Sequence, residues 1–547
     1  MAAVAVSLLA FALAAATPAQ AYDPSDQPPF AGGGGREARS AYEQPEGFSL
    51  SARQALEIAK TTSAYTRSFA EYGMLSAEFA TIDGNWEVVF SDSSGTPRAS
   101  VLVADPSGRI LEQWTGWQVE TRLARGYPGA VGGLVGSWWI WIPLSVLFAL
   151  LLVDPRRIVS LRTLDILVLL AFGVSFYFFA RGRIDISVPI VYPLLAWLFV
   201  RLTMIGFARL KSDWDPIEAV AGWREKALLP LAGLLALGYV ATALFEAKVI
   251  DVGFASVVGA HLIAVGKPLY GASSSSGQPL LVDVYGPVNY LAYLPFERLF
   301  PWNGSVWDSV PAARVASLVF TLATAGCLYG LGRKAGGESR GHRAGLLLAC
   351  AWLAFPVTLL SVASSFNDSL VALLIAGCLL TLSSAPGRGA LSALAGLTKF
   401  GPLAIAPLMA GGTGERRLRS LATFVAAFIA VAVVVTLPLI PDGGLREIYD
   451  RSLGYQAGRG SPFSIWGQDP SVEPLQSLLK VFAVLFALAL YFFPRRRDLV
   501  QVAALASAAV IALEVCAMHW FYPYLLWLLP GALIAFTLSG RQQAESD

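Results

Sequence analysis

The sequence predicts a multi-pass α-helical membrane protein with a small α+β domain near its N-terminus. Apolar residues make up 55% of the 547 residues and charged residues only 14%, whereas soluble domains carry roughly 25% charged residues. The apolar residues are gathered in runs of about 20, the length of helix that crosses a bilayer. Residues 47–125 differ from the rest because they show the shorter apolar patterns of a soluble fold.

The segment before residue 47 predicts two simple elements. Residues 1–21 are apolar and end in Thr17-Pro18-Ala19-Gln20-Ala21, an Ala-x-Ala-type cleavage site that predicts a signal peptide. No Lys or Arg precedes the apolar stretch, so a retained membrane anchor is the alternative. Residues 22–46 include Gly32-Gly33-Gly34-Gly35 and predict a flexible linker.

Residues 47–130 predict a small extracytoplasmic α+β domain. Ser49 and Ser51 are suited to cap a helix over Ala52–Lys60. The strands that follow are indicated by alternating apolar residues and by turn residues between them. They cover Trp86–Phe90, Ala99–Ala104 and Ile110–Trp114, with turns at Ser93-Ser94-Gly95 and Asp105-Pro106-Ser107-Gly108.

This order of helix and hairpin resembles a PepSY-type domain, with Trp86-Glu87-Val88 and Ser107-Gly108-Arg109-Ile110-Leu111 as the matching pieces. The resemblance covers fewer than a hundred residues. We find no catalytic constellation in this domain, so an accessory or regulatory role is the expectation.

Eleven apolar runs predict membrane-spanning helices in the rest of the chain. The first three form an added module, 136–207, before a core at 227–540, and residues 541–547 are expected to be a cytoplasmic tail. The runs lie near 136–153, 163–180, 188–207, 227–246, 309–331, 343–361, 368–385, 419–438, 475–494, 498–518 and 522–540.

A further apolar stretch at 390–410 is interrupted by Lys399, Gly401 and Pro402. Irregular backbone at membrane depth must line a cavity or pack against protein, so we predict a broken or re-entrant segment there. The positive-inside rule then puts the short basic loops in the cytoplasm and the N-terminal domain outside. A complete crossing by 390–410 is the alternative, and it would place Arg416-Arg417 outside.

Two carboxylates lie in the long polar loop at 248–308, which this topology places outside. Asp251 follows the 227–246 span closely, and a carboxylate at such a half-wet boundary is suited to act as a general base. The alternative for Asp251 is a helix-end charge in the headgroup layer. Asp283 is a candidate second acid, metal ligand or substrate contact, with a turn-forming role as the alternative, and Tyr285 beside it offers a ring face for a sugar.

Charged and amide side chains also stand at the ends or breaks of apolar runs. Asn367 and Asp368 form a very short outer loop, where capping of the next helix is the alternative to a functional role. Lys399 is costly within an apolar stretch. It could meet a lipid phosphate or pair with an acid, while snorkelling toward a headgroup is the alternative.

The last outer segments supply three more candidates. Arg459 could clamp a phosphate and Trp466 could stack on a sugar, with a solvated loop as the alternative for both. His519 could bind a phosphate or a sugar hydroxyl, although its aromatic neighbours also fit an interfacial belt.

In their order along 227–540, these segments resemble the GT-C type of membrane glycosyltransferase, and most closely the polyprenyl-phosphate-mannose-dependent group of glycosyltransferase family 87. One departure is that three spans precede the helix before the first large loop. The matching pieces are Asp251, Gly266-Lys267-Pro268-Leu269-Tyr270, Tyr285-Gly286-Pro287, Phe366-Asn367-Asp368, Thr398-Lys399-Phe400-Gly401-Pro402, Ser461-Pro462-Phe463-Ser464 and the stretch from His519 to Pro530.

The resemblance implies an inverting transfer of a hexose or pentose, mannose being the family's sugar, from a polyprenyl-phosphate donor to an extracytoplasmic glycan, lipid or protein acceptor. By position, Asp251 would be the base, with Asp283 as a second catalytic candidate. Lys399 or Arg459 would stabilise the leaving phosphate. Tyr270, Tyr285 and the remaining candidates would contact substrate. We expect a multi-pass protein of a bacterial plasma membrane that acts in cell-envelope synthesis and contacts membrane lipid.

The sequence establishes no cofactor; a divalent cation, Mg²⁺ or Mn²⁺, stays open and its ligands are unknown. Two other functions also stay open, namely a lipid or polysaccharide transporter or flippase and a non-catalytic membrane sensor. A transporter would show paired inverted repeats, which are not evident here. The lack of a basic cluster interleaved with exposed aromatic residues argues against nucleic acid as a partner. The cysteines, all in apolar runs, are expected to be inert.

Overall fold

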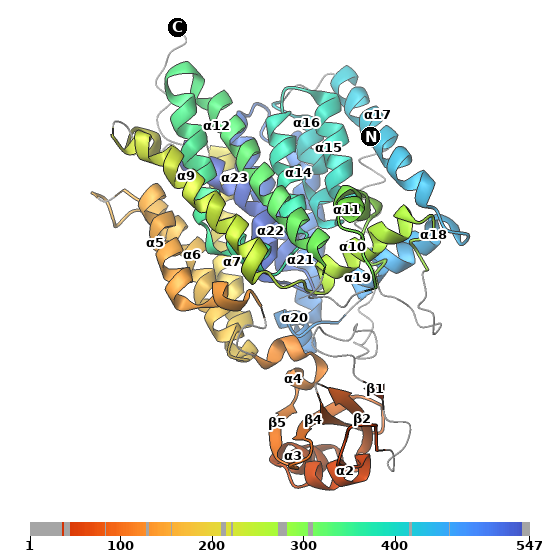
Figure 1. Cartoon of the computed structure of the whole chain (residues 1–547). Helices are drawn as coiled ribbons and strands as arrows, with labels where there is room; N and C mark the ends of the chain where they lie inside the picture. The colour runs from red at the N-terminus through yellow and green to blue at the C-terminus, as the bar shows by residue number, and fades with distance from the viewer. Residues whose placement is uncertain are drawn as a thin grey trace. The chain divides into compact units, whose positions relative to one another are not determined.

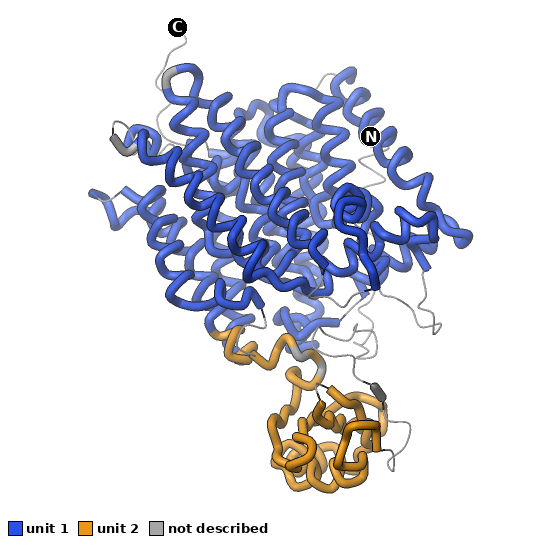
Figure 2. Tube along the Cα trace, in the orientation of Figure 1, with its two compact units in different colours: residues 1–20, 131–177, 185–547 blue, residues 21–130, 178–184 orange. Residues whose placement is uncertain are grey.

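The computed structural model of the chain (Figure 1) consists of helices and one small sheet. It divides into two compact units (Figure 2). The N-terminal unit holds residues 21–130 and 178–184, and the membrane unit holds residues 1–20, 131–177 and 185–547. Described residues are 36–37, 44–82, 84–126, 131–154, 156–208, 215–219, 223–271, 282–304, 310–414, 418–458 and 460–538.

The predicted signal peptide and nearly all of the predicted linker lie outside the described residues. The predicted cytoplasmic tail and Arg459 also lie outside them.

The N-terminal unit is an antiparallel sheet of strand order β1-β2-β3-β4-β5 with two helices packed on it. The predicted helix is confirmed as α2 (Ala52–Lys60), where Ser51 forms a capping box with Gln54. The three predicted strands are confirmed, while α3 and β2 were not predicted. Beyond α2 the elements are β1 (Arg36–Glu37), α3 (Ser63–Tyr72), β2 (Ser76–Ile82), β3 (Asn85–Ser91), β4 (Pro97–Ala104), β5 (Ile110–Thr115) and the short α4 (Trp117–Glu120).

Strand alternation explains this core. Trp86, Val88 and Phe90 point to one face of the sheet, and every second residue of β4 joins them there. The small side chains of Ala52 and Ala55 let α2 lie close on that face. The sheet therefore buries one face and leaves the other more polar.

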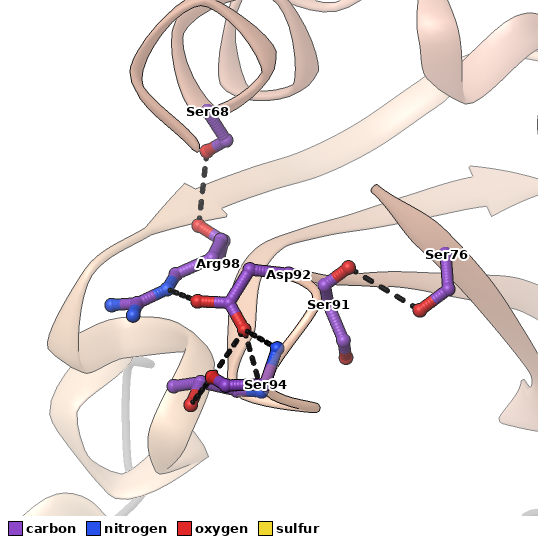
Figure 3. Close-up of polar contacts among 7 residues, drawn as sticks. Ser68, Ser76, Ser91, Asp92, Ser94 and Arg98 are labelled. Atoms are coloured by element: carbon purple, nitrogen blue, oxygen red, sulfur yellow. Dashed lines mark hydrogen bonds and ion pairs between the residues drawn. The ribbon is translucent and has the colours of Figure 1, made fainter. Parts of the chain in front are cut away.

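The β3–β4 turn is organised by Asp92 (Figure 3). Its Oδ1 accepts hydrogen bonds from the backbone N–H groups of Ser94 and Thr96, at 2.8 and 3.1 Å, and from the Ser94 hydroxyl at 2.5 Å. Arg98 donates to Oδ2 at 2.7 Å. Hydrogen bonds from Ser94 and Arg98 hold the pKa of Asp92 well below its usual range.

Every predicted span overlaps a helix of the membrane unit, and α12 overlaps two of them on either side of a kink at Gly337, but the count of eleven crossings is not confirmed. Among the described residues, six helices are long and apolar enough to cross a membrane, or seven if a bent pair at 340–363 counts as one. The stretches at 138–152, 368–380, 499–515 and 522–538 are shorter apolar helices.

The order of the helices follows the sequence. The first half contains α5 (Trp138–Leu152), α6 (Leu161–Phe179), α7 (Ile184–Ala208), α8 (Pro216–Ala219), α9 (Trp223–Ala241), α10 (Asp251–Ala264), α11 (Pro287–Leu299), α12 (Pro311–Ala354) and α13 (Pro356–Ala363). The second half contains α14 (Asp368–Leu380), α15 (Ala385–Gly396), α16 (Ala406–Gly411), α17 (Leu418–Thr436), α18 (Gly444–Tyr449), α19 (Tyr455–Gly458), α20 (Ile465–Gln468), α21 (Glu473–Phe492), α22 (Leu499–Val515) and α23 (Leu525–Leu538).

Burial separates the helices into an inner and an outer set. Most residues of α14 and α22 and nearly all residues of α23 are buried, as expected of helices that are apolar all round and packed inside protein. On the outer helices α9, α17 and α21, large apolar side chains are exposed, such as Leu237 at 67%, Val434 at 69% and Leu478 at 65%. Water would not favour such a surface, and a lipid environment accounts for it.

The predicted break in 390–410 is confirmed: α15 ends at Gly396 and the chain turns before η6 (Gly401–Ile405) and α16. Arg388, near the start of α15, donates from Nε to the Met409 carbonyl near the end of α16 at 2.8 Å. The two arms therefore form a hairpin whose ends lie together. An α15 arm of 12 residues rises about 18 Å, well short of a bilayer core of roughly 30 Å.

Candidate functional site

A buried ion pair lies at the tip of the α15–α16 hairpin. Lys399 Nζ lies 2.8 Å from Asp368 Oδ1, which opens α14. Asp368 is 1% exposed and Lys399 is 9% exposed. A lone charge is costly in such surroundings, and an opposite charge within hydrogen-bond distance offsets much of that cost. Of the two roles open to Lys399, the structure shows the pairing with an acid.

Aromatic side chains surround the same ammonium group. Lys399 Nζ lies over the rings of Tyr285, Tyr524 and Trp527, at 5.5, 5.4 and 5.6 Å from their centroids. Trp527 also donates from Nε1 to Asp368 Oδ1 at 2.8 Å. Ring faces carry partial negative charge and stabilise a cation at these distances. The pair is thus held from α14, the hairpin tip, the α10–α11 loop and α23.

The segment that carries Tyr285 is fixed to the hairpin by its backbone. Gly286 N donates to Thr398 O at 3.2 Å and Val288 N donates to Leu397 O at 3.0 Å. A Cβ atom on Gly286 would lie 2.1 Å from Leu397 O. Only glycine permits this approach, so residue 286 sets how closely the Tyr285 ring can come to Lys399.

A second polar chain leads from this centre to α10. Asn367 donates from Nδ2 to Asn289 Oδ1 at 2.8 Å, and Asn289 donates from Nδ2 to Ser256 Oγ at 2.9 Å. All three residues are completely buried. Asn367 is the residue before α14 but makes no side-chain capping bond, so its amide serves the link to α11 instead.

Asp251 is the first residue of α10, and its Oδ1 accepts from Val252 N at 2.8 Å. This end of α10 lies against the turn that leads to Asp368. Lys248 N donates to Ala363 O at 2.9 Å, and a Cβ atom on Gly253 would lie 2.6 Å from Ser365 O. The fold therefore brings the Asp251 end of α10 next to the turn before Asp368.

Asp283 contacts a different set of residues. Its Oδ2 accepts from Gly271 N at 2.9 Å and lies 3.4 Å from Arg451 Nη1. Burial raises the pKa of Asp283, against the opposing effects of the Gly271 hydrogen bond and the Arg451 charge. Asp283 thus joins the α10–α11 loop to the segment after α18.

The tyrosines of this loop hold its backbone. Tyr270 donates from its hydroxyl to Tyr285 O at 3.0 Å. The hydroxyl of Tyr290 donates to Val282 O at 2.5 Å and accepts from Tyr285 N at 3.0 Å. Tyr270 is buried, and burial raises the pKa of its hydroxyl above the usual range. The ring of Tyr285 faces Lys399 while its backbone is held by these two tyrosines.

The last candidates lie in the segments around α20 and before α23. His519 Nδ1 lies 2.8 Å from Ser461 Oγ, and the His519 ring lies 6.3 Å from that of Tyr524. Trp466 is 3% exposed and donates from Nε1 to Val515 O at 2.9 Å. These contacts fix the ring within this segment, and its stacking on a sugar stays a prediction.

Sequence reasoning missed three residues of this centre: Asn289, Tyr524 and Trp527. Asn289 lies in an otherwise apolar helical turn, and a single buried amide has no local signal. Tyr524 and Trp527 follow the aromatic neighbours of His519 that fit an interfacial belt, and a ring cluster that follows a histidine is the signal that could have indicated them. Within the described residues, no group of three or more His, Cys, Asp or Glu side chains is placed to hold a metal ion.

The C-terminal part of the membrane unit matches a known family. Residues 284–540 match the sequence model of glycosyltransferase family 87. Curated proteins and solved structures yielded no match. The match confirms the predicted family resemblance for this range, which contains Tyr285, Asn367, Asp368, Lys399, Trp466 and His519, whereas Asp251, Tyr270 and Asp283 precede it. The PepSY resemblance stays a prediction.

Proposed function

Because residues 284–540 match glycosyltransferase family 87, we propose that this chain is an integral membrane glycosyltransferase with a polyprenyl-phosphate sugar as donor. The acceptor is an extracytoplasmic glycan, lipid or protein hydroxyl. The observation that carries the proposal is the Asp368–Lys399 pair, set among aromatic rings inside the family-matching range. A cation and ring faces together suit a sugar phosphate.

In the proposed reaction, Asp251 accepts the proton of the acceptor hydroxyl as the oxygen attacks the anomeric carbon. A bond forms between that oxygen and the anomeric carbon, and the bond from the anomeric carbon to the phosphate oxygen breaks. The phosphate oxygen leaves with the electron pair, and attack from the opposite face inverts the configuration. Asp251 is proposed for this role because its end of α10 lies against the turn before Asp368.

Lys399 is proposed to stabilise the negative charge that develops on the leaving phosphate. His519, near Tyr524, is proposed to contact a sugar hydroxyl or the phosphate.

The test uses the purified full chain in lipid nanodiscs with a panel of polyprenyl-phosphate sugars and candidate acceptors, with products detected by mass spectrometry. We expect transfer from at least one donor, and a loss of roughly 10²- to 10⁴-fold in kcat for Asp251→Asn. Asp498→Asn is the matched control. Asp498 also stands at a helix start, where it caps α22, and Asn caps as well as Asp.

Two outcomes would overturn parts of the proposal. Full transfer by Asp251→Asn would remove Asp251 as the base. A folded protein that transfers no sugar from any donor, but moves the sugar lipid across vesicle membranes, would favour the transporter alternative instead.

A further inference from the structure

The hydroxyl of Tyr522 is held by two helices that precede the family-matching range. It is hydrogen-bonded to Ser175 Oγ on α6 at 2.8 Å and to Ser187 Oγ on α7 at 2.9 Å. Ser175 also donates to the Ser187 carbonyl at 2.7 Å. All three residues are buried. Three buried hydroxyl groups thus satisfy one another at a single point between α6, α7 and η10 (Tyr522–Tyr524).

Aromatic contacts extend this attachment. Phe176 meets Tyr522 edge to face, with ring centroids 5.1 Å apart. Phe172 is stacked with Trp520 at 5.9 Å. Both phenylalanines are on α6, one turn apart, and their partners flank Phe521 in the chain. The face of α6 therefore holds the whole stretch before α23, in addition to the hydroxyl of Tyr522.

A second attachment involves α7 and the segment at α20. The hydroxyl of Tyr192 accepts from Ile465 N at 3.1 Å, and its ring meets Trp466 edge to face at 5.8 Å. Ile465 lies four residues after Ser461 in the chain, and the Ser461 hydroxyl contacts His519. Helix α7 thus contacts both segments that meet at His519, and α6 contacts the segment before α23.

These two segments carry part of the candidate site. Tyr524, in the same η10 turn as Tyr522, faces Lys399 and stacks on Trp527 with centroids 4.6 Å apart. Movement of Tyr522 would shift Tyr524, and with it one of the rings around Lys399. A misplacement of about 1 Å can cost roughly 100-fold in rate.

We propose that α6 and α7 form a positioning element for the site, with Tyr522, Ser175 and Ser187 as positioning residues. These helices lie outside the range that matches the family, so the proposal gives a role to the added module at 136–207. It rests on the proposed transferase function. None of the three residues is assigned contact with the substrate.

The test compares Tyr522→Phe and the double variant Ser175→Ala/Ser187→Ala with wild type in the full chain. Each variant breaks the bonds between Tyr522 and the serines. We expect kcat to fall about 10- to 100-fold with the donor KM changed less than about threefold. Both variants remove the same hydrogen bonds. We therefore expect the kcat of the triple variant to be no lower than the smaller of the two kcat values.

Tyr239→Phe is the matched control. Tyr239 is also buried, and its hydroxyl donates to Leu353 O at 2.9 Å. Removal of this hydroxyl breaks a buried tyrosine hydrogen bond that is not part of the α6–α7 attachment. We expect Tyr239→Phe to keep the kcat of wild type when all variants are assayed below their unfolding temperatures.

Hydrogen–deuterium exchange gives a readout that does not depend on turnover. We expect Tyr522→Phe to increase exchange over residues 516–527 and to leave the start of α22 unchanged. Increased exchange with an unchanged kcat would overturn the positioning role. Unchanged exchange over residues 516–527 would show that these hydrogen bonds do not stabilise the segment, which would also overturn it. If the wild type transfers no sugar, the proposed function fails, while exchange still decides whether α6 and α7 hold this segment.

Discussion

The Asp368–Lys399 pair makes a quantitative prediction about stability. The perturbation is a cycle of Asp368→Asn, Lys399→Met and the double variant. Asn keeps an oxygen that can accept the Trp527 indole bond, and Met fills much of the lysine's volume. Each single variant leaves one charge without its opposite at a site where Asp368 is 1% exposed.

The expected magnitudes follow from that burial. Removal of one partner of a buried pair costs about 3–5 kcal/mol, because the remaining charge stays desolvated. In Asp368→Asn the three rings around Lys399 remain, and they stabilise its charge there as they do in the wild type. The double variant leaves no lone charge, so we expect it to be more stable than either single variant, with a coupling energy of about 3 kcal/mol.

The assay is reversible unfolding of the full chain in mixed micelles, with the free energy of unfolding measured for all four proteins. The Arg446–Asp450 pair is the control, because its side chains are 90% and 58% exposed at 3.6 Å. Its coupling is expected to stay below about 1 kcal/mol. If the effects of Asp368→Asn and Lys399→Met on the free energy of unfolding simply add, the two charges do not stabilise each other and the reasoning is refuted.

Three further predictions concern other positions. Gly286→Ala places a Cβ atom 2.1 Å from Leu397 O, so we expect a loss of about 1–3 kcal/mol and reduced transfer, while Gly326→Ala, where nothing lies within 4 Å, should keep both. Burial raises the pKa of Asp283 above its ordinary 3.8. The stability that Asp283 contributes is therefore fully present below pH 3.8 and is lost as the pH rises through the raised pKa of the folded protein. The Tm of wild type minus that of Asp283→Asn should fall across that window, and a constant difference would contradict this. Hydrogen bonds lower the pKa of Asp92 from 3.8, so its contribution is present above pH 3.8 and is lost as pH falls through the lowered value. Hydrogen exchange at the β3–β4 turn should show that acid-dependent loss in wild type but not in Asp92→Asn.

Much of the fold could be predicted because its signals are local. Ser51 capped the predicted helix α2, and turn residues separated the predicted strands. The break at Gly401 and Pro402 followed from residues that interrupt a helix. The number of crossings could not be fixed in the same way, because hydropathy gives the length of an apolar run and not the length of the helix within it.

The site was predicted less completely because its contacts join distant parts of the chain. The cost of an isolated Lys399 indicated that it needs a partner, but nothing local identified Asp368, which lies 31 residues earlier. Asn289 could not be recognised, because its partners come from α10 and the turn before α14. The sequence also does not show that Trp466 is enclosed, because hydropathy does not give which side of a short helix is buried.

The hairpin tip also has a consequence for biogenesis. On the translocon scale, an unpaired Asp or Lys costs up to about 2.5–3.5 kcal/mol to insert, the value for the centre of a helix. Asp368 at the start of α14 and Lys399 at the hairpin tip therefore each make insertion of their own segment alone less favourable. Once Asp368 and Lys399 meet, the charges cancel. We therefore expect these segments to enter the lipid together as one preassembled hairpin bundle rather than one helix at a time.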